Sequence, residues 1–500
     1  MKRVKNPYDK VVSLSRETHL LISAMQILEW DQETYMPHDA ADIRAQQLEY
    51  LTSLIHKKKT SSSFDKALSL AEKLDLDEEK KAALREWRKD FNKAKKLPIS
   101  FEKAFSNLTS KAMTVWRKAK ADNSFKTFRP YLEKIVHLCR KKADYLGYQA
   151  HPYDALLDLF EPDMTVSRIE PLFTRLQEKL TPLTKEITTR FIPNTQCLEG
   201  HFSIDGQKNL SLHLLHLMGL EKGFSRLDES AHPFCMGSHP TDIRLTTHIK
   251  THSFTPNFFA VMHEAGHALY DRDLPLEQFG TPLAEAVSLG IHESQSRFWE
   301  TIIGHSRPFW DYFYPILQKQ FPGNFGSTPY ETFYRAIHKV QPSLIRIFAD
   351  EVTYSLHIIL RFKIEKMLIE GSLKVKELPE VWNAKMKEYL GILPPNDAEG
   401  CLQDIHWSMG TFGYFPTYAL GNLYAASFFA AFTKQHPEWK EKVAGGHLHF
   451  IVEWLKNGIH RYGRRFSPEQ LLHRVTHTHL SEEPYIHYLT EKYQRFFNRD

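Results

Sequence analysis

Apolar residues recur with a helical period through most of the first 150 residues, and this periodicity constrains the fold more than any other feature. Residues 77–96 and 101–120 show it in stretches rich in Ala, Leu, Lys and Glu. No linker rich in Gly, Ser or Pro, no low-complexity tract and no repeat interrupts the chain. A length of 500 residues gives a prior of about three domains. The pattern instead predicts one mainly α body over residues 1–500, with a division into two lobes as the alternative.

Composition indicates a globular protein without nucleic-acid or membrane partners. Hydrophobic residues make up 42% of the chain and supply a large core, and the net charge of +5 is spread along the chain rather than gathered in a tail. The basic cluster at residues 85–96 is interleaved with acidic residues, so a solvated helix face is favoured over a nucleic-acid patch. The longest apolar run, residues 418–432, is too short to span a bilayer and predicts a buried helix.

Cysteine usage and the start of the chain both indicate a cytoplasmic protein. The cysteines form no CxxC pair and are interpreted as reduced thiols, at positions Cys139, Cys197, Cys235 and Cys401. Residues 1–16 are charged, and the apolar run from Leu20 to Leu28 is short and flanked by charges. A secretory signal needs a cleaner apolar run and a small-residue cleavage site.

One segment departs from the helical pattern. Residues 242–249 alternate apolar or β-branched residues with polar ones, which predicts a short, half-buried strand. A helix is expected directly after it, with Thr255 as N-cap and Pro256 at the first helical position. This helix is expected to run to Tyr270 and to be stopped by Pro275.

The predicted helix contains an HExxH motif, in which His263, Glu264 and His267 carry the chemistry. Residues four apart lie about 40° apart around a helix axis, so both imidazoles project from one face. This spacing suits two nitrogens on a single Zn²⁺, with the glutamate placed as general base. Among 27 histidines a random match has a chance of about one in ten. We favour a metal site because the helix is otherwise apolar, which makes unpartnered histidines costly.

The third metal ligand has two candidate locations. Asp273, six residues after His267, occupies the place of the last metzincin ligand, but that arrangement needs glycine where this chain has Tyr270. The alternative is a carboxylate on a second helix, and residues 282–304 are helix-like.

That second helix offers Glu285, Glu293 and Glu300. We favour Glu293 because the small residues Gly290 and Ser294 flank it and are expected to allow close approach to the first helix. It also lies far enough from His267 for a loop and an antiparallel return.

Two further groups have weaker support from the residues alone. In a helix expected to open at Pro342, Arg346 and Asp350 lie one turn apart, which fits a surface ion pair as well as an arginine that grips a carboxylate. His406 and Tyr414 lie near a turn-forming stretch. They are suited to stabilising an oxyanion, although packing aromatics are the commoner case and two other tyrosines, Tyr418 and Tyr424, are near.

Several motifs are spread over nearly the whole chain: Trp30-Asp31-Gln32 with Met36-Pro37, the run Tyr153 to Asp158, His232-Pro233-Phe234, Asp242 to Thr246, the HExxH, His292-Glu293-Ser294-Gln295, Ile345 to Asp350, and Gly400 to Trp407. In this order they resemble the carboxypeptidase Taq-type metallocarboxypeptidases. One departure is Asp163, where the family pattern leads us to expect glycine, and it puts only that local turn in question.

The resemblance implies a large helical metallopeptidase fold with a long substrate groove, a short sheet beside the HExxH helix, and a homodimer. It implies one divalent metal ion, Zn²⁺ or alternatively Co²⁺, with Glu293 as the third ligand beside His263 and His267. It favours Arg346 as the group that binds the free C-terminal carboxylate of the peptide, and it favours His406 and Tyr414 as catalytic groups. Arg244 and His232 join the predicted substrate-binding residues. Arg244 is the alternative to Arg346 for binding the carboxylate, or it closes the groove and limits how far a substrate extends past the metal.

These parts predict hydrolysis of peptides from the C-terminus, with Glu264 taking a proton from a water activated by the metal. Broad specificity follows if the substrate pairs as a strand with residues 242–249, because main-chain hydrogen bonds do not read side chains. Two alternatives stay open. An endo-acting helical oligopeptidase would use the same metal site without a terminal clamp, and a non-catalytic helical binding protein would carry the HExxH by accident.

Overall fold

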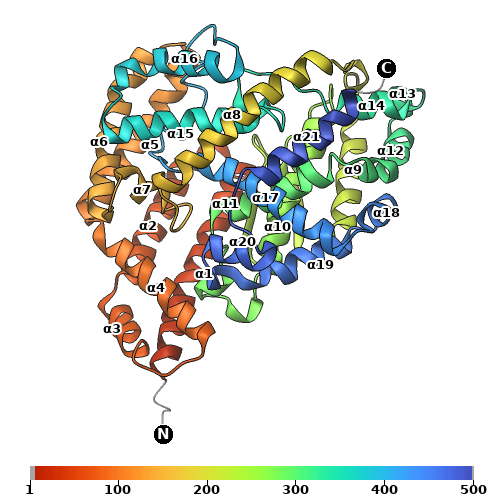
Figure 1. Cartoon of the computed structure of the whole chain (residues 1–500). Helices are drawn as coiled ribbons and strands as arrows, with labels where there is room; N and C mark the ends of the chain where they lie inside the picture. The colour runs from red at the N-terminus through yellow and green to blue at the C-terminus, as the bar shows by residue number, and fades with distance from the viewer. Residues whose placement is uncertain (1–5, 498–500) are drawn as a thin grey trace.

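Helices fill the first half of the chain in the computed structural model, which describes residues 6–497 (Figure 1). The predicted helices at 77–96 and 101–120 are confirmed as α4 and α5, and α4 begins where the Asp77 carboxylate accepts the Lys80 backbone N–H. The helices of this half are α1 (Pro7–Thr34), α2 (Ala41–Lys59), α3 (Ser62–Ala71), α4 (Glu78–Lys96), α5 (Ile99–Ala121), α6 (Phe125–Leu146), α7 (Pro152–Leu157), α8 (Val166–Arg190) and α9 (Ile204–Leu217). Residues 1–5 of the charged start lie outside the described residues.

The second half begins with one small sheet and continues as helices. The strands are β1 (Ser225–Glu229), β2 (Cys235–His239) and β3 (Asp242–Thr247). The helices are α10 (Thr255–Asp273), α11 (Leu289–Arg297), α12 (Arg307–Gln320), α13 (Pro322–Phe325), α14 (Tyr330–Ala336), α15 (Tyr354–Glu370), α16 (Leu378–Leu390), α17 (Pro416–Gln435), α18 (Trp439–Ala444), α19 (His449–Gly458), α20 (Pro468–Thr476) and α21 (Glu483–Phe497). The mainly α fold with a short sheet is therefore confirmed. None of the helices in the described part combines the length and hydropathy needed to cross a membrane.

The predicted strand is confirmed as β3, which ends two residues sooner than expected, at Thr247. It is the middle strand of the sheet, parallel to β1 and antiparallel to β2. Because both edges of β3 are already paired, the expectation that a substrate strand pairs with it is wrong. In the described sheet β2 is an outer strand, and it packs against α10.

The main hydrophobic core surrounds α10, α11 and α17, which lie near the centre of the molecule (Figure 1). The apolar run at 418–432 is confirmed as part of the buried helix α17. A second cluster of buried hydrophobic side chains lies among α1, α3 and α4. The single domain over residues 1–500 and its division into two lobes stay predictions.

Two expected helices differ from the structure. Residues 282–304 are a 3₁₀ turn (Pro282–Ala284), then α11, then a π-helix (Phe298–Ile303). The helix expected from Pro342 is absent from the described chain, where only the 3₁₀ turn Arg346–Phe348 forms. The Asp350 carboxylate accepts the backbone N–H groups of Gln341, Val352 and Thr353 there, and such bonds compete with helix.

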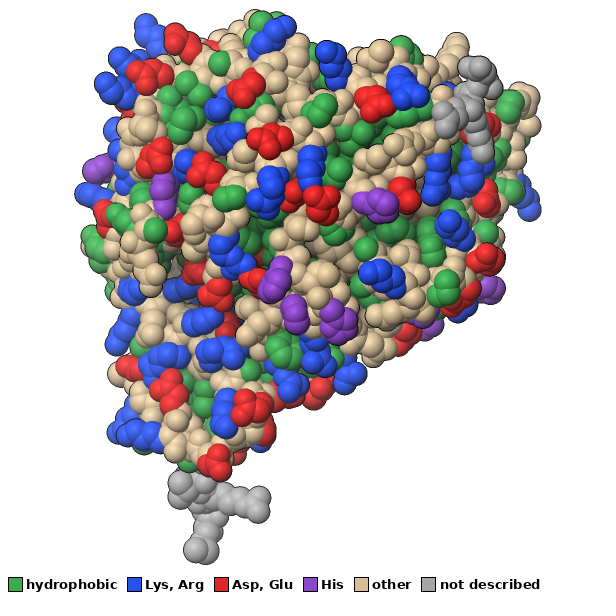
Figure 2. All heavy atoms as spheres, viewed as in Figure 1, with side chains coloured by type: hydrophobic (Ala, Val, Ile, Leu, Met, Phe, Trp, Pro, Cys, Tyr) green, Lys and Arg blue, Asp and Glu red, His purple; other side chains and the backbone are tan. Residues whose placement is uncertain are grey.

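The basic cluster of α4 is neutralised by neighbouring groups. Arg88 pairs with Asp65 and Glu72 at 2.8 Å, and Lys93 pairs with Asp158 at 2.6 Å. Cationic and anionic side chains are intermixed over the face shown in Figure 2. The unusual Asp163 adopts φ +64°, the left-handed region that favours glycine, so the turn that the family pattern leads us to expect is kept with an aspartate.

Candidate metal centre

The helix that carries the HExxH is α10, at the centre of the core. It runs three residues further than expected and ends before Pro275, as predicted. Thr255 is not the N-cap, because Phe254 occupies that position without a side-chain cap and Pro256 lies at the second helical position. Glu264 is buried on this helix, while His263 and His267 are partly exposed and have ring centroids 5.0 Å apart.

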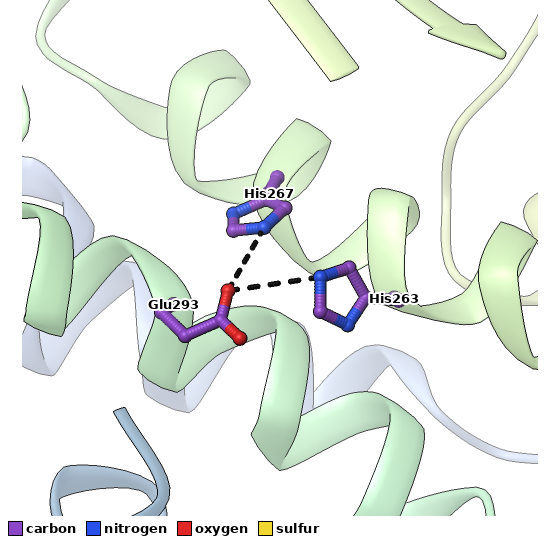
Figure 3. A group of neighbouring side chains, drawn as sticks. All are labelled: His263, His267 and Glu293. Atoms are coloured by element: carbon purple, nitrogen blue, oxygen red, sulfur yellow. Dashed lines mark ion pairs between the residues drawn. The ribbon is translucent and has the colours of Figure 1, made fainter. Parts of the chain in front are cut away.

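Glu293 on α11 points at both imidazoles (Figure 3). Its Oε2 lies 3.6 Å from Nε2 of His263 and 3.4 Å from Nε2 of His267. A metal about 2.0–2.1 Å from each ligand in tetrahedral geometry separates ligand atoms by about 3.3 Å. The three side chains therefore fit a small divalent ion. Among the described residues, they are the group of His, Cys, Asp and Glu side chains whose possible ligand atoms lie close enough together to share one ion.

Two glycines that the sequence reasoning did not single out let three helices meet here. A Cβ on Gly266 of α10 would lie 2.5 Å from the backbone carbonyl oxygen of Gln295 on α11. A Cβ on Gly421 of α17 would lie 2.5 Å from Cγ of Glu293. The expectation for Gly290 is wrong, because this residue faces Glu161 and Tyr424 rather than α10.

The rival third ligands are engaged elsewhere. Asp273 bonds to Arg272 at 2.8 Å and to His460 at 3.2 Å. Glu285 accepts from His19 at 2.7 Å and from Arg464 at 2.8 Å. Neither belongs to the group formed with His263 and His267. The geometry thus favours Glu293 over both.

Other acidic side chains surround the two histidines. The π-helix presents Glu300, whose Oε2 lies 2.7 Å from Nδ1 of His263 and also accepts from Arg297 at 2.8 Å. A carboxylate that accepts from the outer nitrogen of a ligating histidine fixes the ring and its tautomer. Of the two extra glutamates on the predicted second helix, Glu300 thus contacts the site and Glu285 does not.

Burial and charge shift the pKa values in this cluster. Burial raises the pKa of Glu264 to about 7, near the value that suits a general base at neutral pH. Burial lowers the pKa of His267 to about 4. At His263 burial also opposes the charge, but Glu293 and Glu300 outweigh it and raise the pKa to about 9. The negative potential that favours a proton on His263 equally favours a divalent cation in its place.

Arg346 is buried in a second polar cluster, but Asp350 is not its partner. Its guanidinium bonds to Asp404 at 3.0 Å and to the Tyr354 hydroxyl at 3.1 Å. Arg361 bonds to the other oxygen of the same carboxylate at 2.7 Å. Among these three charged groups, two guanidiniums share one carboxylate, which leaves one surplus positive charge.

The neighbours of Arg346 correct the expected surroundings. Ile347 and Phe348 are 59% and 69% exposed, so the apolar residues that suggested a buried helix lie at the surface. The Tyr418 ring lies 5.0 Å from the guanidinium, and its hydroxyl lies 3.5 Å from Nε2 of His406. The His406 and Tyr414 rings are 5.4 Å apart.

The three tyrosines Tyr414, Tyr418 and Tyr424 differ in their contacts. Tyr424 donates its hydroxyl to Glu161 at 2.8 Å and is buried, so it is occupied elsewhere. Tyr414 is partly buried, and burial raises the pKa of its hydroxyl above the ordinary value. His406 has a buried Nδ1 without a hydrogen-bond partner among the described residues. Tyr414, Tyr418 and His406 therefore form one group beside Arg346.

Arg244 lies on β3, and His232 lies on the loop that follows β1. Arg244 bonds to Asp242 at 2.8 Å, and its guanidinium lies 4.5 Å from the Trp30 ring of α1. It thus joins the sheet to the N-terminal helices. His232 is exposed on the loop between β1 and β2, and no hydrogen bond or ion pair of the described residues joins its ring to the candidate ligands.

Comparison with known proteins agrees with this architecture. Residues 10–493 match the family model described as carboxypeptidase Taq (M32) metallopeptidase. The chain is 39% identical to carboxypeptidase 1 of Bacillus subtilis, covering 95% of each chain, and 37% identical to thermostable carboxypeptidase 1 of Thermus thermophilus, covering 98% and 99%. The solved structure of the Pyrococcus furiosus carboxypeptidase is 36% identical over 98% of this chain and 99% of that one, with a TM-score of 0.95.

A helical fold that brings an HExxH helix against a glutamate on a second helix defines a metallopeptidase-type protein. The match over nearly the whole chain then places it within that class. The chain belongs to the carboxypeptidase Taq (M32) metallopeptidase family.

Proposed function

We propose that this chain removes amino acids one at a time from the C-terminus of peptides, with one divalent ion bound by His263, His267 and Glu293. The observation that carries the proposal is the convergence of these three side chains next to the buried Glu264, in a chain of this family. Two imidazoles and one carboxylate suit Zn²⁺, with Co²⁺ as the alternative. When bound, the metal supplies Lewis acidity toward the scissile carbonyl and the attacking water.

The residues of the chain perform the remaining steps. Glu264 takes the proton of the attacking water and returns it to the leaving amine, because its burial holds its pKa near neutrality. Glu300 holds the His263 ring through Nδ1. Tyr414 and His406 donate toward the oxygen on which negative charge develops, and their place in one group with Tyr418 beside Arg346 supports this role.

Arg346 gives the enzyme its preference for chain ends. A buried guanidinium is costly unless an anion pairs with it, and Asp404 is already shared with Arg361. The free carboxylate of a peptide supplies the missing anion, whereas an internal amide does not. Broad specificity is supported by the exposed apolar side chains of Ile347 and Phe348 beside this clamp.

The substrate main chain lies along the outer edge of β2 in this proposal. That edge takes the place of β3, whose two edges are paired, and β2 packs against the HExxH helix. Main-chain hydrogen bonds to an edge strand align a peptide without reading its side chains. Arg244 and His232 lie on this sheet and its loop and limit how far a peptide extends in the groove.

A peptide digest followed by mass spectrometry tests the function. Incubation of a mixture of free-acid peptides is expected to yield ladders shortened from the C-terminus, and a chelator is expected to abolish them. Internal fragments from C-terminally amidated peptides would instead identify an endo-acting oligopeptidase and contradict the proposal.

We also propose that the protein is a cytoplasmic homodimer. The homodimer rests on the family, and the reducing compartment accords with four cysteines that all remain free thiols. Light scattering coupled to size-exclusion chromatography measures the mass in solution, and a value near that of one chain would contradict the dimer.

A further inference from the structure

The two histidines of the HExxH have different partners at Nδ1, the ring nitrogen that does not face Glu293. Glu300 contacts His263 directly at 2.7 Å, whereas Nδ1 of His267 faces another imidazole, with Nδ1 of His292 at 2.5 Å. The other ring nitrogen of His292, Nε2, lies 2.9 Å from Oδ1 of Asp271. His267, His292 and Asp271 therefore form a chain of three groups that ends on a carboxylate.

The proposed metal binding determines which nitrogens of His267 and His292 carry protons. Nε2 of His267 faces Glu293, so a ligating His267 has a bare Nε2 and carries its proton on Nδ1. That N–H has to donate, and its partner is Nδ1 of His292, which must then be bare. The proton of His292 consequently lies on Nε2 and is donated to Asp271, an acceptor only.

The surrounding fold holds each member of the chain. Asp271 lies four residues after His267, on the same face of α10. The Tyr270 ring packs 5.2 Å from the His292 ring. On β2, a Cβ at Gly237 would lie 2.5 Å from Oδ2 of Asp271, so the strand leaves room for this carboxylate.

We propose that His292 and Asp271 are positioning residues that fix the tautomer and the ring orientation of His267 for metal binding. The proposal rests on the metal centre proposed above and extends it, since the pair His292-Glu293 supplies one ligand and the group that orients another. It also assigns a role to Asp271, which lies two residues before the metzincin-like candidate Asp273.

The test measures Zn²⁺ affinity of the full chain by competition with a chromophoric chelator. His292→Phe keeps a ring but removes the acceptor, and is expected to weaken Zn²⁺ binding by about 10–100-fold, as for other groups behind a metal ligand. His292→Gln keeps an acceptor for His267 and a donor for Asp271, and is expected to bind within about threefold of the parent. Equal affinities of the parent and His292→Phe, or equal losses in both variants, would overturn the proposal.

A matched control lies close by. His460 is also a buried histidine paired with an aspartate of α10, since its Nδ1 lies 3.2 Å from Oδ2 of Asp273, but it makes no hydrogen bond or ion pair with His263, His267 or Glu293 among the described residues. His460→Phe is expected to leave Zn²⁺ affinity within about threefold of the parent. A loss of Zn²⁺ affinity as large as that of His292→Phe would be a general effect of losing a buried histidine–aspartate pair. It would overturn the proposed role of His292 and Asp271.

A second pair of variants covers the case in which His292→Phe does not fold, as judged by circular dichroism of the metal-free chain. Asp271→Leu removes the acceptor of His292, whereas Asp271→Asn keeps an oxygen that can accept. The leucine variant is expected to bind Zn²⁺ at least tenfold more weakly than the asparagine variant, and equal affinities would overturn the proposal. If the parent and Glu293→Ala bind Zn²⁺ equally well, the proposed metal centre itself is wrong, and the role proposed for His292 and Asp271 is wrong as well.

Discussion

Glu264 is buried beside the candidate metal ligands but is not one of them. A substitution there is therefore expected to change catalysis without changing metal binding. Glu264→Gln keeps the shape but cannot accept a proton. Hydrolysis of free-acid peptides is expected to fall by about 10²–10⁴-fold while the chain still binds about one metal ion. Steady-state kinetics and elemental analysis of the same preparation measure both quantities, and activity within tenfold of the parent would remove Glu264 as the general base.

In the proposed function, Arg346 makes the enzyme act on chain ends rather than on internal bonds. Arg346→Ala is expected to lower kcat/KM for free-acid peptides, because one partner of a buried charge pair is lost. The loss corresponds to about 2–5 kcal/mol of transition-state stabilisation. The already slow turnover of amidated peptides should scarcely change. Arg244→Ala is the matched comparison, and it is expected to alter the dependence on peptide length instead.

The Arg346 variant also has a clear contrary result. An equal loss with free-acid and amidated peptides would make the arginine a structural partner of Asp404, with no part in recognising the carboxylate. The pair with Asp404 and Arg361 would then explain its burial.

At the level of elements, the site depends on how closely α10 and α11 approach. Gly266→Ala would bring a Cβ to 2.5 Å from the Gln295 carbonyl oxygen, so one helix has to move. Overpacking of this kind costs about 1–3 kcal/mol of stability, and displacement of Glu293 from the histidines is expected to weaken Zn²⁺ binding. Thermal unfolding and chelator competition measure the two effects.

Gly323→Ala controls for the loss of a glycine as such. Gly323 lies in the short helix α13, is exposed, and a Cβ there meets no atom within 4 Å. This variant is expected to change stability by less than about 0.5 kcal/mol and to bind Zn²⁺ like the parent. If both alanine variants behave alike, close packing of α10 on α11 is not what positions Glu293.

At the scale of the whole molecule, Arg464 is one of several arginines that join the N-terminal helices to the body that holds the site. Arg464 bonds to Asp90 of α4 at 2.7 Å, to Glu86 of α4 at 3.1 Å and to Glu285 at 2.8 Å. Arg464→Ala is expected to cost about 2–3 kcal/mol, less than the about 3–5 kcal/mol of a fully buried pair, because Asp90 and Glu285 are partly exposed.

Hydrogen exchange locates that effect. Backbone amides of α4 are expected to exchange faster in Arg464→Ala, while those of α17 keep their protection. Arg129→Ala removes an exposed pair with Glu133 and is expected to cost less than about 0.5 kcal/mol. Uniform loss of protection in both helices would mean that Arg464 stabilises the fold as one unit instead of attaching the N-terminal helices.

The sequence by itself determined what depends on short separations along the chain. Helical periods predicted α4 and α5, and an apolar run too short to span a bilayer predicted the buried α17. Alternation predicted β3, and the four-residue spacing placed His263 and His267 on one face. Each of these patterns reflects backbone geometry within one segment, so neighbouring residues suffice to reveal it. The ordered motifs added the family, because their combination is far more specific than any single one.

Only the tertiary structure decided which distant groups meet. Four carboxylates were candidates for the third ligand, and the packing of α11 on α10 brings Glu293 to both histidines. Asp273 and Glu285 bond elsewhere, and Glu300 contacts only the outer nitrogen of His263. Arg346 pairs with Asp404 across 58 positions and not with its neighbour Asp350. Such choices depend on contacts between segments far apart in the chain, where side-chain pairing and close packing outweigh local propensity.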